Sequence, residues 1–432
     1  MFSHETSVLL QKSLPQIPLM ICNRDLTRDI DDLVAMAFPR GKLAVVYDYD
    51  TEAALGNNVL RALKGRFEAT QIYLRGVVAA DMQTVEKIRA ESQGCDALVA
   101  VGSGTINDLC KYAAHLDGKP YIVFPTAASM NGYLSANASI SEDGYKKTLT
   151  AQMPKAVFCD LSVIAKAPAR LSRSGLGDSL ARPTAQFDWL LSHLLLGTSY
   201  NEVPFALLAP IENVLFENAR GIAMGDLPSI ELLMHTLLLS GLGMTIAGGS
   251  SPASQSEHMV AHAMHMLEGV TLPHTFHGEE IGMTALAMAR MQENLLKASP
   301  RFKNNIFPEE QLKKLFGEHV TTEAKGAYKV KSALLPLPPG EGRGEGLSTD
   351  SGANGESLTL TLSRREREYR GWDGIATQLE KIMLPAHKIE AILHAAGAPT
   401  TPEMLGWMEK DYDVAIKCAR FLRDRFTVLD LE

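Results

Sequence analysis

Short apolar runs alternate with amphipathic stretches through the first 165 residues. The runs have the length of β-strands and are almost continuously apolar, which is typical of strands buried on both faces. Stretches with helical periodicity separate them, and strand–helix alternation predicts a parallel sheet covered by helices on both sides. The six runs are LMICN (19–23), KLAVVYDY (42–49), ATQIYL (69–74), ALVAVGSG (97–104), YIVFPT (121–126) and AVFCD (156–160).

The pattern changes at about Pro168, where strand-like runs stop and long helical periodicities rich in Leu, Met and Ala begin. We therefore predict an α/β domain over 1–165 and an all-α domain over 166–432. A run without charged side chains, Leu232 to Ser256, is long enough to cross a membrane. It contains several hydroxyl groups and a histidine, so it favours a buried helix entering a tight loop and no membrane span.

A segment from Leu334 to about Trp372 fits neither domain. It is dense in Gly, Pro, Ser, Glu and Arg and poor in residues that could pack. Its two arms, PLPPGEGRGEG and LTLTLSRREREYRG, resemble translated copies of a bacterial repeat element. We expect a disordered surface insertion at about 334–372, with a regulatory loop as the alternative.

Charge and cysteine content narrow the class of protein. The formal net charge is −8 without a basic block, which argues against a nucleic-acid partner. The five cysteines are scattered and show no CxxC spacing, which favours free thiols in a reducing compartment. The N-terminus lacks the pattern of a secretory signal. A cytoplasmic location follows as the expectation.

Five of the twelve histidines lie between residues 258 and 277. His258, His262 and His265 have i, i+4 and i+7 spacing, so one helix would carry them on one face. His274 and His277 follow after a proline. Neutral imidazoles together with one carboxylate could hold a divalent cation with an open position. For each histidine alone, a hydrogen-bonded core residue is the competing interpretation.

Two turns at predicted strand ends suggest a phosphate site. The segment GSGT (102–105) follows a strand and enters a helix, so backbone N–H groups and the helix dipole could attract a phosphate. PTAAS (125–129) ends the next strand and adds hydroxyl groups at the same edge. Asp48, at the end of another strand, could accept from a ribose hydroxyl. A tight turn and a solvated aspartate are the plain alternatives.

The segment GLGDSL places Asp178 between glycines and an expected helix start. An aspartate there is suited to capping a helix, and spacing alone favours that interpretation. Its functional alternative is the carboxylate of a metal site.

Five motifs together resemble one superfamily. They are VGSGTINDLCK, FPTAASMNGYLS, GLGDSLARPTAQFDW, PASQSEHMVAH and TFHGEEIG, in this order. The chain resembles the iron-containing alcohol dehydrogenase and dehydroquinate synthase superfamily, and within it the glycerol-1-phosphate dehydrogenases, including the AraM-type enzymes. The resemblance covers roughly 18–330 and the last sixty residues.

This resemblance implies a dehydroquinate synthase-like fold, in which a Rossmann-like nucleotide-binding domain precedes a helical metal-binding domain. It implies one divalent metal (zinc, nickel or iron) held by Asp178, His258 and His277, and His262 in contact with substrate. Residue 131 is a substrate-contacting Asp in relatives and is Asn131 here; relatives also carry an arginine near Ser251. The expected contacts with NAD or NADP are Gly102, Ser103, Gly104, Thr105, Thr126, Ser129 and Ser135, with Asp48 favouring NAD.

The implied reaction is the reduction of dihydroxyacetone phosphate to sn-glycerol 1-phosphate by a homo-oligomeric enzyme. His262, Asn131 and Asp178 would be its catalytic residues, with Arg182 and Lys147 as candidate phosphate donors. One alternative is a polyol dehydrogenase acting on an unphosphorylated substrate such as glycerol. Another is a homologue that binds metal and nucleotide with altered or lost catalysis; a lyase resembling dehydroquinate synthase ranks last.

Overall fold

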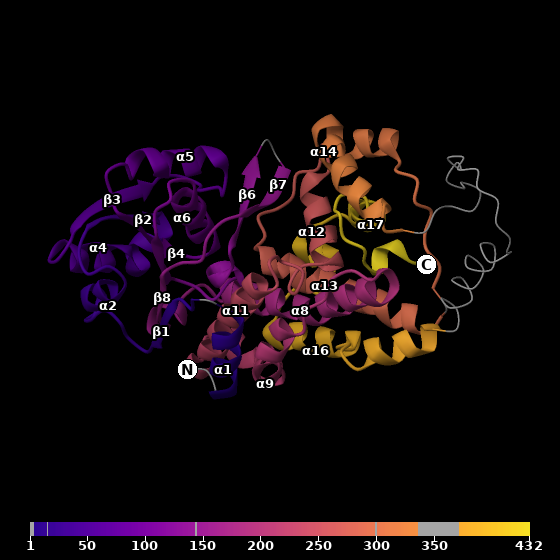
Figure 1. Ribbon diagram of the computed structural model, residues 1–432, viewed down its shortest axis with the longest axis horizontal. Coiled ribbons are helices and arrows are strands. Elements are labelled where there is room, and N and C mark those ends of the chain that lie inside the picture. The colour runs from indigo at the N-terminus through magenta and orange to yellow at the C-terminus, as the bar shows by residue number, and fades with distance from the viewer. Residues whose placement is uncertain (1–3, 15, 143–144, 299, 336–370) are drawn as a thin grey trace, which may run out of the picture.

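The six apolar runs form one six-stranded parallel sheet in the computed structural model (Figure 1). The strand order is β1-β8-β5-β4-β2-β3. The strands are β1 (Leu19–Asn23), β2 (Lys42–Asp48), β3 (Glu68–Leu74), β4 (Ala97–Gly102), β5 (Tyr121–Pro125) and β8 (Ala156–Asp160). The structure describes residues 4–14, 16–142, 145–298, 300–335 and 371–432.

Each face of the sheet belongs to a different hydrophobic cluster. Along β2, Val45 and Val46 are both fully buried but pack into opposite clusters, as expected for side chains that alternate along a strand. Helices α2 (Ile30–Ala37) and α4 (Asn57–Lys64) cover one face, and α5 (Met82–Glu91) and α6 (Gly104–Leu116) cover the other. Between β2 and α4 lie α3 (Tyr49–Thr51) and a π-helical turn, η1 (Glu52–Gly56).

A β-hairpin that the apolar pattern did not reveal leaves the sheet domain toward the helical half (Figure 1). Its antiparallel strands are β6 (Asn137–Glu142) and β7 (Tyr145–Thr150). Only Ala138 and Ile140 of β6 are fully buried, since one face packs near α6 and the other is partly open. The strand therefore has too few apolar residues to stand out in the sequence. A short 3-10 turn, η2 (Gly132–Leu134), precedes it.

From residue 161 onward the described chain is helical, which confirms the predicted order of an α/β part followed by an all-α part. The exact boundary at 165 remains a prediction. The helices are α7 (Leu161–Ile164), α8 (Ala169–Leu196), α9 (Val203–Glu217), α10 (Ala219–Ala223), α11 (Leu227–Ile246), α12 (Ser256–Met266), α13 (His277–Leu296), α14 (Glu309–Ser332), a helix over 371–380, α16 (Ala386–Ala396), η3 (Pro402–Leu405), α17 (Glu409–Ala419) and η4 (Val428–Asp430); α1 (His4–Ser13) precedes the sheet.

The long uncharged run forms the core helix α11, as the sequence indicated. Among the described helices, α11 has the length and apolar composition of a membrane span, but 72% of its most apolar window is buried inside the protein. It packs against α9 and η2, so its apolar surface faces other parts of the chain.

Glycines bring α8 and α13 into backbone contact. A Cβ atom on Gly177 would lie 2.0 Å from the carbonyl oxygen of Gly278, and one on Gly278 would lie 1.8 Å from that of Ser174. No real Cβ atom tolerates such distances, so only glycine permits this crossing. The contact places the start of α13 beside the first third of α8.

The predicted insertion lies outside the described residues except at its two ends. Leu335 and Trp372, at those ends, are both buried in the hydrophobic cluster that surrounds α12, α13 and α17. The chain on either side of the segment therefore belongs to one packed core.

Candidate metal centre and active site

Asp178 lies in the interior of α8 and does not cap a helix, so the capping interpretation is wrong. The flanking glycines mark close contacts instead: a Cβ atom on Gly175 would lie 2.0 Å from the carbonyl oxygen of Ala128. Asp178 is 2% exposed, and its Oδ2 accepts a hydrogen bond of 2.8 Å from the backbone N–H of Asn131. The loop after β5 thus fixes one side of this carboxylate.

The expected helix carries His258, His262 and His265, and His277 is the first residue of α13. Nε2 of His258 lies 3.7 Å from Oδ1 of Asp178, and the rings of His258 and His277 have centroids 5.1 Å apart. Asp178, His258 and His277 each offer one ligand atom within 4.8 Å of the others. Three segments distant in the sequence therefore meet with a donor set suited to a divalent cation.

Two of the clustered histidines have other contacts. Nε2 of His265 lies 2.9 Å from both carboxylate oxygens of Glu280. The ring of His274 meets that of Phe276 edge to face, with centroids 5.3 Å apart. Neither histidine belongs to the group formed with Asp178.

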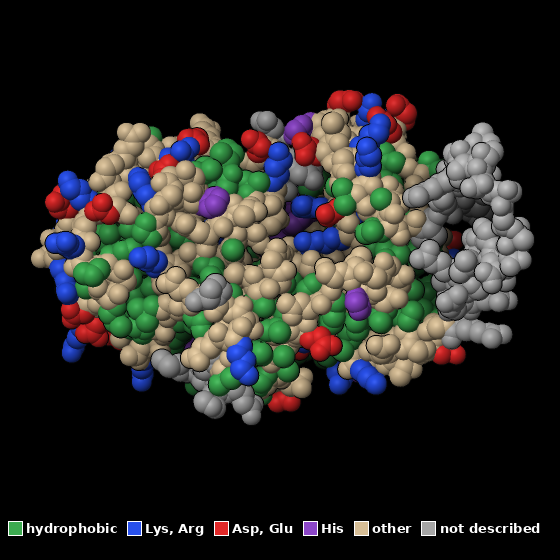
Figure 2. All heavy atoms as spheres, viewed as in Figure 1, with side chains coloured by type: hydrophobic (Ala, Val, Ile, Leu, Met, Phe, Trp, Pro, Cys, Tyr) green, Lys and Arg blue, Asp and Glu red, His purple; other side chains and the backbone are tan. Residues whose placement is uncertain are grey.

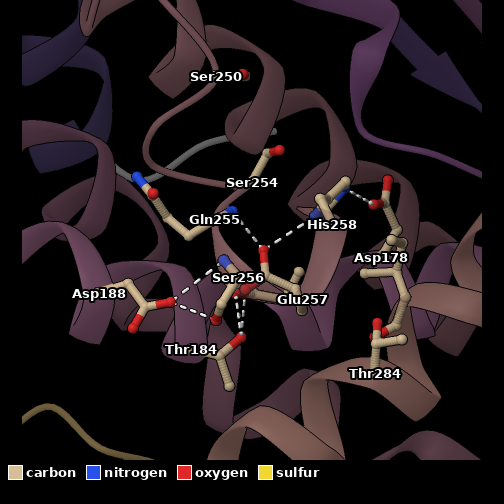
Figure 3. Close-up of polar contacts among 12 residues, drawn as sticks. Asp178, Thr184, Asp188, Ser250, Ser254, Gln255, Ser256, Glu257, His258 and Thr284 are labelled. Carbon is tan, nitrogen blue, oxygen red and sulfur yellow. Dashed lines mark hydrogen bonds and ion pairs between the residues drawn. The ribbon is translucent and has the colours of Figure 1, made fainter. Parts of the chain in front are cut away.

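A fully buried carboxylate, which sequence reasoning missed, supports His258 (Figure 3). Oε1 of Glu257 accepts from the backbone N–H of Gln255 at 2.6 Å and lies 2.9 Å from Nδ1 of His258. Its Oε2 accepts from the hydroxyl of Thr184 at 3.2 Å. A carboxylate accepts and does not donate when ionised, so Nδ1 carries the ring proton. The lone pair of Nε2 then points toward Asp178.

A second buried acid, Asp188, joins the start of α12 to the end of the chain. It accepts from the backbone N–H and hydroxyl of Ser256, from the side chain of Gln292 at 3.2 Å and from the backbone N–H of Val428 at 3.1 Å. Burial raises the pKa of Asp188 to about 7. Nothing in the local sequence marked this residue, because its partners lie 68 to 240 positions away.

A cavity of about 260 Å³ lies beside the histidines. Figure 2 shows a hollow between the two halves of the molecule in which histidine and Lys or Arg side chains gather. Nη2 of Arg423 lies 3.2 Å from Nδ1 of His262. A guanidinium has no acceptor, so Nδ1 accepts and Nε2 of His262 carries the ring proton. The cavity is lined by Asn137, Thr148, Gly249, Ser250, Ser254, His258, Met259, His262, Arg423, Asp424 and Arg425.

The two predicted phosphate turns lie next to each other at the carboxyl edge of the sheet. The backbone N–H of Thr126 donates to the carbonyl oxygen of Gly102 at 3.3 Å. A Cβ atom on Gly102 would lie 2.6 Å from that of Ile106, so the turn into α6 requires glycine. Ser103 precedes α6 without capping it through its side chain, and Gly104 and Thr105 form the first turn of α6.

The remaining predicted nucleotide contacts differ in their surroundings. Ser129 is buried at the end of the second turn. Ser135 is also buried, and its hydroxyl accepts from Nζ of Lys111 at 3.2 Å while donating to backbone carbonyls. Asp48 ends β2 next to β4, and its Oδ1 caps the following turn by accepting from Thr51.

Comparison with known proteins places this chain in a family. A model of the iron-containing alcohol dehydrogenases matches residues 21–168. Glycerol-1-phosphate dehydrogenase [NAD(P)+] of Thermococcus kodakarensis is 35% identical over 279 residues, which cover 64% of this chain and 78% of that protein. The enzyme of the same name from Bacillus velezensis is 32% identical over 61% of this chain and 70% of that protein.

The fold extends to solved structures. Glycerol dehydrogenase of Schizosaccharomyces pombe superposes with a TM-score of 0.53 at 19% identity, over 91% of this chain and 94% of that one. The arrangement of a parallel sheet followed by helices is thus shared with this glycerol dehydrogenase. The chain belongs to the glycerol-1-phosphate dehydrogenase family of iron-containing alcohol dehydrogenases.

Proposed function

We propose that the protein is a metal-dependent NAD(P)H oxidoreductase that interconverts dihydroxyacetone phosphate and sn-glycerol 1-phosphate. The observation that carries this proposal is the convergence of Asp178, His258 and His277 within 4.8 Å of one another. The names of the relatives, which are 32 to 36% identical to this chain, supply the substrate and the nucleotide.

The donor set fits a divalent cation of the zinc class. One carboxylate and two imidazoles satisfy three positions of a tetrahedral site and leave the fourth for substrate, as catalytic zinc sites do. The same donors suit nickel and iron. A cation bound there would polarise the substrate carbonyl as a Lewis acid.

The protein's own residues would position the reactants. The N–H groups at the start of α6 and the adjoining turn at Thr126 would hold the dinucleotide phosphates. His262, whose ring centroid lies 5.8 Å from that of His277, would donate a hydrogen bond from Nε2 to a substrate oxygen, and a water held at the ring would supply the proton for the alcohol. Asn131, whose backbone holds Asp178, would contact the substrate through its amide.

A dehydrogenase for an unphosphorylated polyol is the alternative function. Asn131, where the family resemblance implies a substrate-contacting carboxylate, leaves the substrate open and also motivates a homologue with altered or lost catalysis. A homologue with lost catalysis would bind metal and nucleotide yet oxidise no NADH. Turnover of dihydroxyacetone phosphate against dihydroxyacetone separates these cases.

The decisive experiment combines metal analysis with an NADH- or NADPH-oxidation assay on the purified protein. We expect the wild type to hold about one divalent metal per chain and to reduce dihydroxyacetone phosphate in preference to dihydroxyacetone. Asp178→Ala should lose metal and activity together, whereas Asp413→Ala, an exposed change on α17, should lose neither. If Asp178→Ala retains both, the ligand assignment is wrong.

We further propose that the enzyme acts in the cytoplasm as a homo-oligomer. Light scattering coupled to size exclusion measures the assembly directly, and a monomer at micromolar concentration would contradict this part of the proposal.

A further inference from the structure

Two arginines from the end of the chain line the same cavity as the candidate metal ligand His258. Arg423 and Arg425 follow α17, and the acid between them, Asp424, is exposed. The cavity, at about 260 Å³, is smaller than the roughly 300–1,000 Å³ of pockets for drug-sized ligands. A small molecule inside it would contact both the imidazoles of His258 and His262 and the guanidinium groups.

The two arginines have different surroundings. Arg425 donates through Nη2 to the hydroxyl of Ser250 at 2.7 Å and through Nη1 to the carbonyl oxygen of Ser254. These bonds fix the loop that precedes α12. Burial lowers the pKa of Arg425 to about 10, which still leaves it charged at neutral pH. Arg425 is therefore suited to shaping the cavity wall and to adding positive charge.

Arg423 contacts His262, which lies beside the candidate metal ligands. Its Nη2 contacts Nδ1 of His262 at 3.2 Å, and the guanidinium carries five N–H donors in a planar fork. That fork matches the oxygens of a phosphate group, and pairing of this kind is stronger than a neutral hydrogen bond.

The two residues that the sequence offered for a phosphate contact, Arg182 and Lys147, each form an ion pair with a carboxylate. Arg182 is 8% exposed and forms an ion pair with Glu212, and it also donates to Gln186 at 3.1 Å. Lys147 lies 2.9 Å from a carboxylate oxygen of Glu142. Neither residue lines the cavity.

We propose that Arg423 binds the phosphate group of the substrate and determines the preference for a phosphorylated over an unphosphorylated triose, with Arg425 as a positioning residue for the cavity wall. This inference rests on the proposed function. It assigns substrate selection to a turn near the C-terminus, far in sequence from the metal ligands. By holding Nδ1 of His262, the same guanidinium orients the ring that faces the substrate.

The test uses the metal-loaded enzyme and the variants Arg423→Ala, Arg423→Lys and Arg220→Ala, an exposed arginine on α10. We measure kcat/KM with NADH for dihydroxyacetone phosphate and for dihydroxyacetone. In Arg423→Ala the ratio of the two should fall about 10- to 100-fold, mainly through KM for the phosphorylated substrate. Arg423→Lys, which keeps the charge without the fork, should recover part of the ratio, and Arg220→Ala should match wild type.

Two further readouts identify the ligand. Inorganic phosphate should compete with dihydroxyacetone phosphate, and its inhibition constant should rise about 10-fold or more in Arg423→Ala. The dissociation constant of NADH, measured by fluorescence, shows whether Arg423 binds the phosphates of the cofactor instead. Thermal unfolding of each variant shows whether it is folded, and Arg423→Gln replaces Arg423→Ala if the alanine variant is not.

The outcomes separate the inference from the function on which it rests. A wild type that prefers dihydroxyacetone phosphate, together with an Arg423→Ala variant that keeps this preference, overturns the inference and leaves the function standing. A variant that loses affinity for NADH while its KM for the triose phosphate is unchanged assigns Arg423 to the cofactor and also overturns it. A wild type with no preference for the phosphorylated triose overturns both.

Discussion

The carboxylate of Glu257 lies 2.9 Å from Nδ1 of its neighbour His258, while Nε2 of the same ring lies 3.7 Å from Asp178. The two ring nitrogens are thus divided between a supporting acid and a candidate metal ligand. This arrangement fixes the tautomer and the orientation of the ring. Both residues belong to the first turn of α12, so the helix itself sets their relative position.

We predict that Glu257→Gln weakens metal binding about 10- to 100-fold, the usual cost of losing a group that orients a metal ligand. The change keeps the size of the side chain but removes the charge that favours a proton on Nδ1. Competition with a chromogenic chelator measures the affinity. Glu310→Gln, at an exposed position of α14, is the control, and equal affinities for the two variants would refute the supporting role of Glu257.

The crossing of α8 and α13 should not tolerate a single methyl group. Gly177→Ala would place a Cβ atom 2.0 Å from the carbonyl oxygen of Gly278, so the helices must separate. We expect a loss of about 3 kcal/mol or more in the free energy of unfolding, measured with urea.

The same substitution at an open glycine should raise the free energy of unfolding and not lower it. A Cβ atom on Gly326 of α14 meets no atom within 4 Å, so Gly326→Ala should stabilise the protein by about 0.5–1 kcal/mol. If both alanine variants are equally stable, the close contact between the two helices is not required.

Asp188 should make stability fall as pH rises through the acid range. Its pKa is raised from 3.8 to about 7 in the folded protein by burial. Between these values the folded protein keeps a proton that the unfolded chain has released, so raising the pH lowers the free energy of unfolding. Relative to wild type, Asp188→Asn should remove this decline between pH 4 and about 7.

Urea unfolding of both proteins at several pH values isolates the contribution of Asp188, since all other titrating groups are shared. The two free energies should converge toward low pH once the offset from the lost acceptor is subtracted. Parallel curves across the range would show that Asp188 is ionised in the folded protein.

The charge at Asp48 should influence the choice of nucleotide. Asp48→Asn retains the cap on the turn that follows β2, because asparagine caps helices as well as aspartate does. It removes a carboxylate that would repel a 2′-phosphate, a repulsion of about 1 kcal/mol for two charges about 4 Å apart in a fully solvated setting. We expect kcat/KM for NADPH relative to NADH to rise about fivefold. Asp50→Asn, two residues away and exposed, should leave the ratio near that of wild type.

Local pattern was sufficient for the sheet and for half of the site. The six apolar runs predicted the six parallel strands. The glycines at 102–104 predicted the turn that lies beside Thr126. The spacing of His258, His262 and His265 predicted their common helix. These features are readable because side-chain periodicity and turn chemistry depend on residues a few positions apart.

The roles of Asp178 and Glu257 could not be predicted from the local sequence pattern. Glycines around Asp178 indicated a helix start, yet they serve contacts with Ala128 and Gly278 that no nearby residue reveals. Nothing in the sequence distinguishes Glu257 from a solvent-exposed acid. Its burial and its contacts with Thr184, Gln255 and His258 appear only in the tertiary structure.

The sequence by itself determined the class of fold, the glycine turn at 102–104 and the histidine helix. Residue patterns did not bring Asp178 to His258 and His277; only the family resemblance had implied it, and the tertiary structure shows it. Tertiary structure alone decided that Asp188 joins Ser256 to the end of the chain and that Arg423 reaches His262. The reason is physical. Contacts between residues 68 to 240 positions apart depend on how whole helices pack, and that packing is set by the summed burial of many side chains.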